Sequence, residues 1–113
     1  MLRDYKVYLE DILEASRKIR DYSSGLTFAD FAKDPKTLDA VVRNLEVIGE
    51  ATKKIPESIR TRHTAIDWKK IAGLRDILTH EYFGVDVEVI WDILQNKLPV
   101  VEKQIQDILH EQT

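Results

Sequence analysis

The sequence contains no cysteine and has few residues that interrupt regular structure, with only four glycines and three prolines. The absence of cysteine excludes disulfide bonds and thiolate metal sites, and it suits a reducing compartment. No apolar run approaches the roughly 20 residues that a membrane-spanning helix needs, and the first residues lack the apolar core of a signal peptide. We therefore expect a cytoplasmic protein that does not enter a membrane.

Strand-like alternation, internal repeats and a glycine-rich phosphate loop are also absent from the 113 residues. Apolar residues instead recur at steps of three and four, which is typical of amphipathic helices. The length suits one domain, residues 1–113, which can bury a core without disulfides or metals. We predict an all-α, up-and-down bundle of about four to five helices.

The apolar pattern places the helices along the chain. The expected helices span about residues 4–22, 35–54, 67–84 and 87–108. Residues 26–33 and 56–66 are expected to connect them. Pro99 lies inside the last helix, where it removes a backbone hydrogen bond, so we expect one kinked helix or two nearly collinear ones.

The second expected helix has a stripe of small residues opposite its core face, made by Ala40, Val47 and Ala51 near Asn44. Small side chains let another helix approach closely, so this stripe is a candidate self-association face. Burial within the same bundle explains it nearly as well. The stripe is flanked by Arg43, Glu46 and Glu50.

The residues that most resemble a reactive site lie at the end of the third expected helix: Arg75, Asp76, His80 and Tyr82. Arg75 lies at the edge of an apolar stripe, where a guanidinium needs an anionic or polar partner. Asp76, one turn before His80, can orient the imidazole and raise its affinity for a proton. Because Arg75 and His80 diverge by roughly 140° on a straight helix, a bend or a second copy is needed to aim both at one substrate.

A structural role for these residues is the alternative, because positive side chains at the end of a helix are stabilised by its dipole without doing any chemistry. Spacing alone favours this alternative.

The charge of the chain is unevenly distributed. The formal net charge is -3, which argues against a generic nucleic-acid binder. Residues 53–75, however, hold seven positive and two negative side chains, a local net of +5 that leaves -8 for the rest. This basic stretch is either a solvated surface or a rim that steers phosphate toward the site. The steering candidates within it are Arg60, Arg62, Lys69 and Lys70.

The arrangement Arg75-x4-His80-x-Tyr82 resembles the HEPN superfamily, specifically the HepT-like (DUF86) toxins that pair with minimal nucleotidyltransferase antitoxins. Residues 47–51, Val-Ile-Gly-Glu-Ala, and the run from Trp91 to Pro99 are similar to further family features. The resemblance implies a HEPN-like helical domain that acts as the toxin of a type II- or VII-like toxin-antitoxin system. It also implies an endoribonuclease with an RNA substrate.

The chemistry implied by the motif needs neither a metal nor a cofactor, because RNA supplies its own 2'-hydroxyl nucleophile. His80 suits the acid-base role and Arg75 the phosphate, while Asp76 orients His80 or the hydroxyl. Two metal ligands per chain, Asp76 and His80, are too few for a metal nuclease. A homodimer with both motifs facing one cleft would resolve the divergence of Arg75 and His80.

Tyr82 has no evident catalytic duty, because a phenol with an ordinary pKa near 10 is a poor base at neutral pH. The resemblance implies that the nucleotidyltransferase attaches AMP to this tyrosine; packing on Leu78 is the structural alternative. A different function also stays open for the whole chain: a non-catalytic helical adaptor that binds a nucleotidyltransferase or a nucleotide.

Overall fold

The computed structural model describes residues 4–74, 78 and 86–111 of the chain. Within these residues the protein is all-α, without a strand, as predicted. The helices are α1 (Tyr5–Ser23), α2 (Phe28–Ala32), α3 (Pro35–Lys53), α4 (Glu57–Arg62), α5 (Trp68–Ala72), α7 (Val87–Asp92), the π-helix η2 (Ile93–Lys97) and α8 (Leu98–Glu111). None of the described helices has the length and apolar character needed to cross a bilayer.

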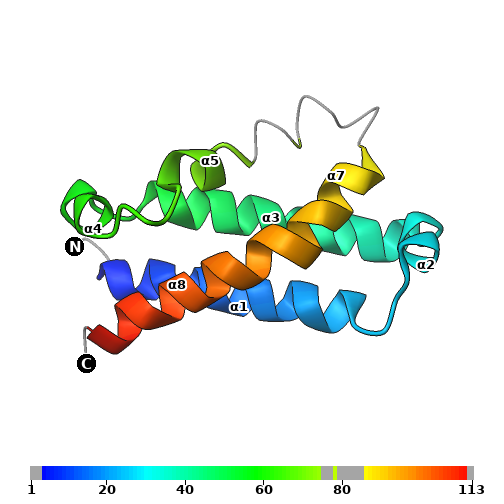
Figure 1. Ribbon diagram of the computed structural model, residues 1–113, viewed down its shortest axis with the longest axis horizontal. Helices are drawn as coiled ribbons and strands as arrows, with labels where there is room; N and C mark the ends of the chain where they lie inside the picture. The colour runs from blue at the N-terminus through cyan, green and yellow to red at the C-terminus, as the bar shows by residue number, and fades with distance from the viewer. Residues whose placement is uncertain (1–3, 75–77, 79–85, 112–113) are drawn as a thin grey trace.

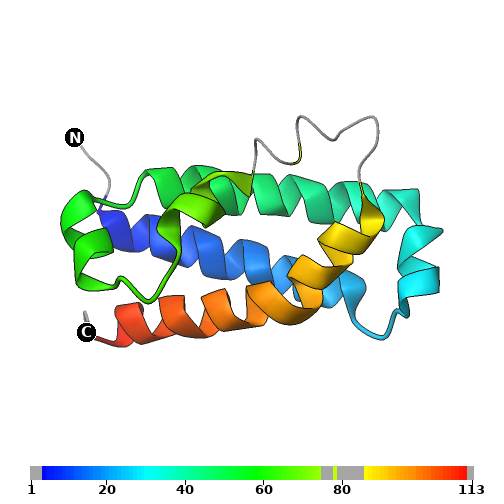
Figure 2. The ribbon, with the colours of Figure 1, turned by 45° about the horizontal axis from the view of Figure 1, so that its top comes forward.

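The long helices α1 and α3 form the centre of the bundle, lying antiparallel and side by side (Figure 1). Helix α8 packs along α1, and the short α5 packs on α3 (Figure 2). The shared core is contributed by every helix, with its largest fully buried side chains being Phe31, Leu9, Ile12, Ile19, Leu45, Ile48, Ile55, Ile90, Ile105 and Ile108. The bundle measures 41 × 28 × 27 Å.

The beginnings of α1 and α3 follow from their capping residues, so both predicted starts are confirmed. Asp4 accepts a hydrogen bond from the amide of Lys6 at 3.0 Å, and Asp34 accepts one from the amide of Thr37 at 3.1 Å. The Thr37 hydroxyl also donates to Asp34, and these bonds hold the pKa of that carboxyl below its usual range. Such caps satisfy amides that the first turn of a helix leaves free.

The two expected connectors join the long helices, but each also contains a short helix that was not predicted. Helix α2 begins with a reciprocal capping box between Thr27 and Asp30, and it buries Phe31 completely. Helix α4 buries Ile59 against the core. A single buried side chain fixes each short helix, and such a signal is too brief to show as periodicity in the sequence.

The helix predicted from Asp67 to Gly84 is also corrected. Asp67 caps α5 as expected, but α5 ends at Ala72, and Gly73 closes it with an amide that bonds the carbonyl of Lys69 at 3.0 Å. Glycine is among the poorest helix formers, which explains the interruption at this position. Leu74 and Leu78 are helical again.

The predicted kink near Pro99 is confirmed, and it takes the form of the π-helix η2. The amide of Leu98 bonds the carbonyl of Ile93, five residues back instead of four. This wider turn immediately precedes Pro99, which lacks an amide hydrogen and whose ring needs space beside the previous turn. The change in direction between α7 and α8 is visible in Figure 2.

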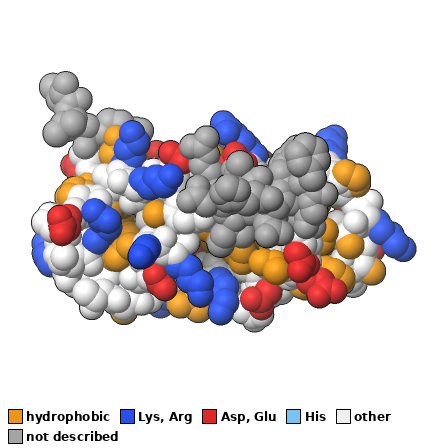
Figure 3. All heavy atoms as spheres, turned by 90° about the horizontal axis from the view of Figure 1, so that it is seen from above, with side chains coloured by type: hydrophobic (Ala, Val, Ile, Leu, Met, Phe, Trp, Pro, Cys, Tyr) orange, Lys and Arg blue, Asp and Glu red, His pale blue; other side chains and the backbone are white. Residues whose placement is uncertain are grey.

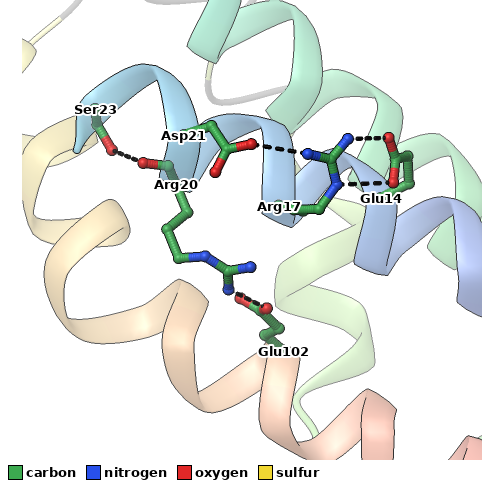
Figure 4. A network of polar contacts seen from close by, with 6 residues as sticks. All are labelled: Glu14, Arg17, Arg20, Asp21, Ser23 and Glu102. Carbon is green, nitrogen blue, oxygen red and sulfur yellow. Dashed lines mark hydrogen bonds and ion pairs between the residues drawn. The ribbon is translucent and has the colours of Figure 1, made fainter.

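Polar contacts on α1 add a second link to α8 (Figure 4). Arg17 contacts Glu14 at 2.5 and 3.1 Å and Asp21 at 2.8 Å, and its guanidinium lowers the pKa of Glu14. These three residues are on one exposed helix face, where ion pairs contribute little. Arg20 instead reaches across to the poorly exposed Glu102 of α8, so this pair joins two helices.

Two phenylalanines of α2 contact the same tryptophan and provide a matched test of the packing. Phe31 is fully buried with its ring centroid 5.2 Å from that of Trp91, whereas Phe28 is 36% exposed at 6.0 Å. We predict that Phe31→Ala lowers the free energy of unfolding by about 3–5 kcal/mol and Phe28→Ala by about 1 kcal/mol or less. Urea unfolding followed by circular dichroism measures both, and equal losses would contradict the packing described.

Candidate functional site

The predicted catalytic and modification residues, Arg75, Asp76, His80 and Tyr82, lie outside the described residues. Leu78, between Asp76 and His80 in the sequence, is described and is 2% exposed in the core. The described helices next to the motif in the sequence are α5 before it and α7 after it. The surfaces of α3 and α4 carry the other candidate residues.

Helix α5 leads into the motif and separates its apolar and basic residues. Trp68 and Ile71, three residues apart, are buried, while Lys69 and Lys70 are exposed. The indole of Trp68 also donates to the carbonyl of His63 at 2.9 Å. The buried pair fixes the orientation of the helix, and the two lysines therefore project into solvent just before Arg75 in the sequence.

Helix α4 contributes the two other predicted steering residues, but in different settings. Arg62 is exposed, whereas Arg60 is half-buried and lines a shallow hollow of about 640 Å³ between α4 and α5. Lys69 lines the same hollow from α5. Of the four predicted residues, the structure thus brings Arg60 and Lys69 together and leaves Arg62 and Lys70 outside the hollow.

The surface around these helices is electrostatically divided. In Figure 3, several Lys and Arg side chains lie over the half of the face that carries α4 and α5, with a few acidic side chains among them, and a group of acidic side chains lies toward α7. Residues 86–92 contain three acids and no base. An anionic strand would therefore be attracted to the α4–α5 side and repelled from the α7 side.

A second surface lies along α1 and α3, where the sequence predicted a self-association stripe. Ala51 is buried at 6% exposure, and Ala40 and Val47 are half-buried, so the stripe is partly covered by the bundle itself. A groove of about 470 Å³ remains, lined by Tyr8, Asp11, Arg43, Glu46, Val47, Glu50, Ala51 and Lys54. The sequence did not indicate the part of Tyr8 and Asp11, because their place here depends on how α1 packs against α3.

His63 follows directly after α4. Its side chain is only 17% exposed, and its Nε2 lies 3.5 Å from Oε2 of Glu111. The end of α8 brings this carboxylate close, which spacing along the sequence could not reveal. Among the described residues, no group of three or more His, Cys, Asp or Glu side chains is arranged to hold a metal ion.

In its described residues the protein is a small all-α bundle with basic side chains exposed on α4 and α5. Residues 12–108 match the model of the family described as Ribonuclease HepT-like. This chain therefore belongs to the ribonuclease HepT-like family, which confirms the resemblance recognised in the sequence. No solved structure matches the chain.

Curated relatives agree with this assignment. The chain is 46% identical over 109 residues to "Putative RNase MJ0127" of Methanocaldococcus jannaschii, covering 96% of this chain and 90% of the relative. It is 43% identical over 108 residues to "Probable ribonuclease HepT" of Thermococcus cleftensis, covering 96% of this chain and 98% of the relative. The similarity thus spans nearly the full length of each protein.

Proposed function

We propose that this chain is a metal-independent endoribonuclease and the toxin of a toxin-antitoxin pair. The observation that carries the proposal is the family match over residues 12–108, a range that contains the Arg75-x4-His80-x-Tyr82 arrangement. The names of the relatives, which describe RNases, support an RNA substrate. The basic α4–α5 surface supports it independently, because phosphate contacts dominate the affinity of proteins for nucleic acids.

In the proposed reaction, the 2'-hydroxyl of the RNA attacks the adjacent phosphorus, and the bond to the 5'-oxygen of the next nucleotide breaks. His80 takes the proton of the hydroxyl or gives one to the leaving oxygen, and Asp76 orients the imidazole. Arg75 binds the phosphate oxygens as negative charge builds on them. No step requires a metal or cofactor. Lys69, Lys70, Arg60 and Arg62 steer the strand toward the motif.

We predict that His80→Ala and Arg75→Ala each remove RNA cleavage while leaving the helical content unchanged. Loss of one acid-base group typically lowers a rate by about 10²–10⁴. The assay uses purified protein, labelled RNA and EDTA, with His110→Ala as control because His110 is an exposed histidine far from the motif in sequence. Full EDTA-resistant cleavage by His80→Ala protein would refute the assignment.

The same variant separates the nuclease from a non-catalytic adaptor. A nuclease toxin arrests growth when it is expressed alone, and His80→Ala relieves the arrest. An adaptor has no reason to arrest growth, so normal growth with the unchanged chain would favour that alternative.

The α1–α3 groove supports the proposal of a homodimer. If two copies of α3 cross antiparallel at a two-fold axis near Val47, Arg43 of one copy comes close to Glu50 of the other, since they lie four residues before and three residues after Val47. Opposite charges would then flank an apolar centre on both sides of the axis. Such a dimer would also contain two copies of the motif.

We predict that Val47→Glu converts a dimer to a monomer at micromolar concentration, because it places two like charges at the axis. Val89→Glu is the matched control, since Val89 is 46% exposed on α7, away from the groove. Light scattering after size-exclusion chromatography gives the mass of each variant. A monomeric unchanged chain with full activity, or a dimer that survives Val47→Glu, would contradict this interface.

Tyr82 is the proposed point of control by the nucleotidyltransferase partner. AMP attached there would add a bulky anion near Arg75 and His80 in the sequence, which would compete with the RNA phosphate and repel the strand. The charge and the bulk of the attached AMP would therefore both inhibit RNA cleavage.

We predict that the cognate nucleotidyltransferase with ATP adds AMP to the peptide containing Tyr82 and suppresses cleavage, whereas Tyr82→Phe stays active and escapes. Mass spectrometry locates the label. Tyr22, 43% exposed at the end of α1, is an internal control for unspecific labelling. Label on Tyr5, Tyr8 or Tyr22 with Tyr82 untouched would show that the proposed point of control is wrong.

A further inference from the structure

We propose that the hollow between α4 and α5 is a phosphate-binding subsite in which Arg60 holds the backbone of the RNA strand away from the point of cleavage. The inference rests on the proposed function and deepens it. In this subsite Arg60 binds one phosphate directly, whereas the exposed cations around it attract the strand without a fixed contact.

Arg60 is the first observation that points to a ligand. Its Nε atom is buried, yet within the described part of the chain this N–H has no hydrogen-bond partner. The same side chain lines the hollow, and the described residues provide no carboxylate within ion-pairing distance of it. A buried donor without a partner is costly, and a guanidinium presents a fork of donors that matches two phosphate oxygens.

The opposite wall of the hollow adds a second cation and a hydroxyl. Lys69 is exposed on α5 and is held there by the burial of Trp68 next to it. Thr64, between the two helices, also lines the hollow. A phosphate placed there would receive the guanidinium from α4 and the ammonium from α5, so two separately anchored helices define its position.

Two acids also line the hollow, and they act differently. The carboxylate of Asp67 accepts the amide of Lys70 at 3.1 Å as the cap of α5, so its charge is engaged by the helix. Glu57, one turn before Arg60, is exposed and has no such cap bond among the described contacts. Its charge opposes an anion in the hollow, so removing that charge should tighten binding.

The shape and position of the hollow favour a strand over a free nucleotide. It is shallow and open, as a surface crossed by a polynucleotide backbone would be, whereas a site for a small molecule encloses most of its ligand. Lys69 precedes the motif residue Arg75 by only six positions. A strand held at Arg60 and Lys69 would thus be bound by the segment that leads into the motif.

The decisive experiment compares Arg60→Ala with Arg62→Ala. Both arginines belong to α4 and both changes remove one positive charge, but only Arg60 lines the hollow. The probe is a fluorescein-labelled single-stranded RNA with 2'-O-methyl groups, which cannot be cleaved, and the readout is fluorescence anisotropy over a range of salt concentrations.

We expect Arg60→Ala to weaken binding about tenfold or more and to reduce the slope of log K against log salt by about 0.7, the value for one phosphate contact of a single strand. Arg62→Ala should weaken binding only about two- to threefold. Arg60→Lys keeps the charge without the fork and should fall between, and Glu57→Gln should bind more tightly. Equal losses for Arg60→Ala and Arg62→Ala would overturn the subsite.

Further measurements test whether the phosphate belongs to RNA or to a free nucleotide, and they separate the subsite from the proposed nuclease activity. Competition by AMP as strong as that by RNA would show a nucleotide site and overturn the assignment to a strand. Thermal unfolding by circular dichroism identifies loss of fold, in which case Arg60→Lys and Glu57→Gln decide the question. The binding difference should persist in the His80→Ala background, so an absence of cleavage would refute the nuclease without touching the subsite.

Discussion

The packing of two tryptophans, the buried Trp68 and the partly buried Trp91, against the core is the constraint on which the rest of the arrangement depends. Trp68 anchors α5 through its buried ring and its bond to the carbonyl of His63. Trp91 anchors α7 through its contacts with Phe28 and Phe31 of α2. The two tryptophans thus hold the helices before and after the segment that carries the motif, and Leu78 adds a buried position within it. Large aromatic side chains suit this role because each buries much apolar surface.

This anchoring explains why the surface can divide its charge so unevenly. A bundle whose stability comes from apolar burial does not depend on pairing its surface charges, since exposed ion pairs contribute little. Arg60, Arg62, Lys69 and Lys70 can therefore lie on the α4–α5 side without an ion pair to any described residue, while three acids lie within residues 86–92. The overall negative charge and a local attraction for phosphate are thus compatible in one small protein.

The sequence predicted the long elements well because their signals are long. Periodicity over α1 and α3 predicted both helices to within a residue or two. It did not reveal α2 and α4, because one buried side chain each, Phe31 and Ile59, leaves no period to detect. It also extended α5 through Gly73, where a low helix propensity outweighed the continuing apolar pattern.

For the candidate site, sequence reasoning could name residues but could not group them. Arg60, Arg62, Lys69 and Lys70 form one basic set by composition, and only the packing of α4 against α5 separates Arg60 and Lys69 from the other two. In the same way, Tyr8 and Asp11 join Arg43 and Val47 only through the antiparallel α1–α3 contact. Such groupings depend on contacts between distant segments, which no local pattern encodes.

The π-helix η2 has a consequence for how this fold can vary. A π turn is equivalent to one residue inserted into an α-helix, and each residue of an α-helix corresponds to a rotation of about 100°. η2 therefore sets the rotational phase of α7 relative to α8, and with it the direction in which Trp91 faces α2. Loss of one residue between 93 and 97 would turn that tryptophan away from its aromatic partners while α8 stayed in place. Among variants of this fold, the length of this short turn should be less free to change than the identity of most residues within it.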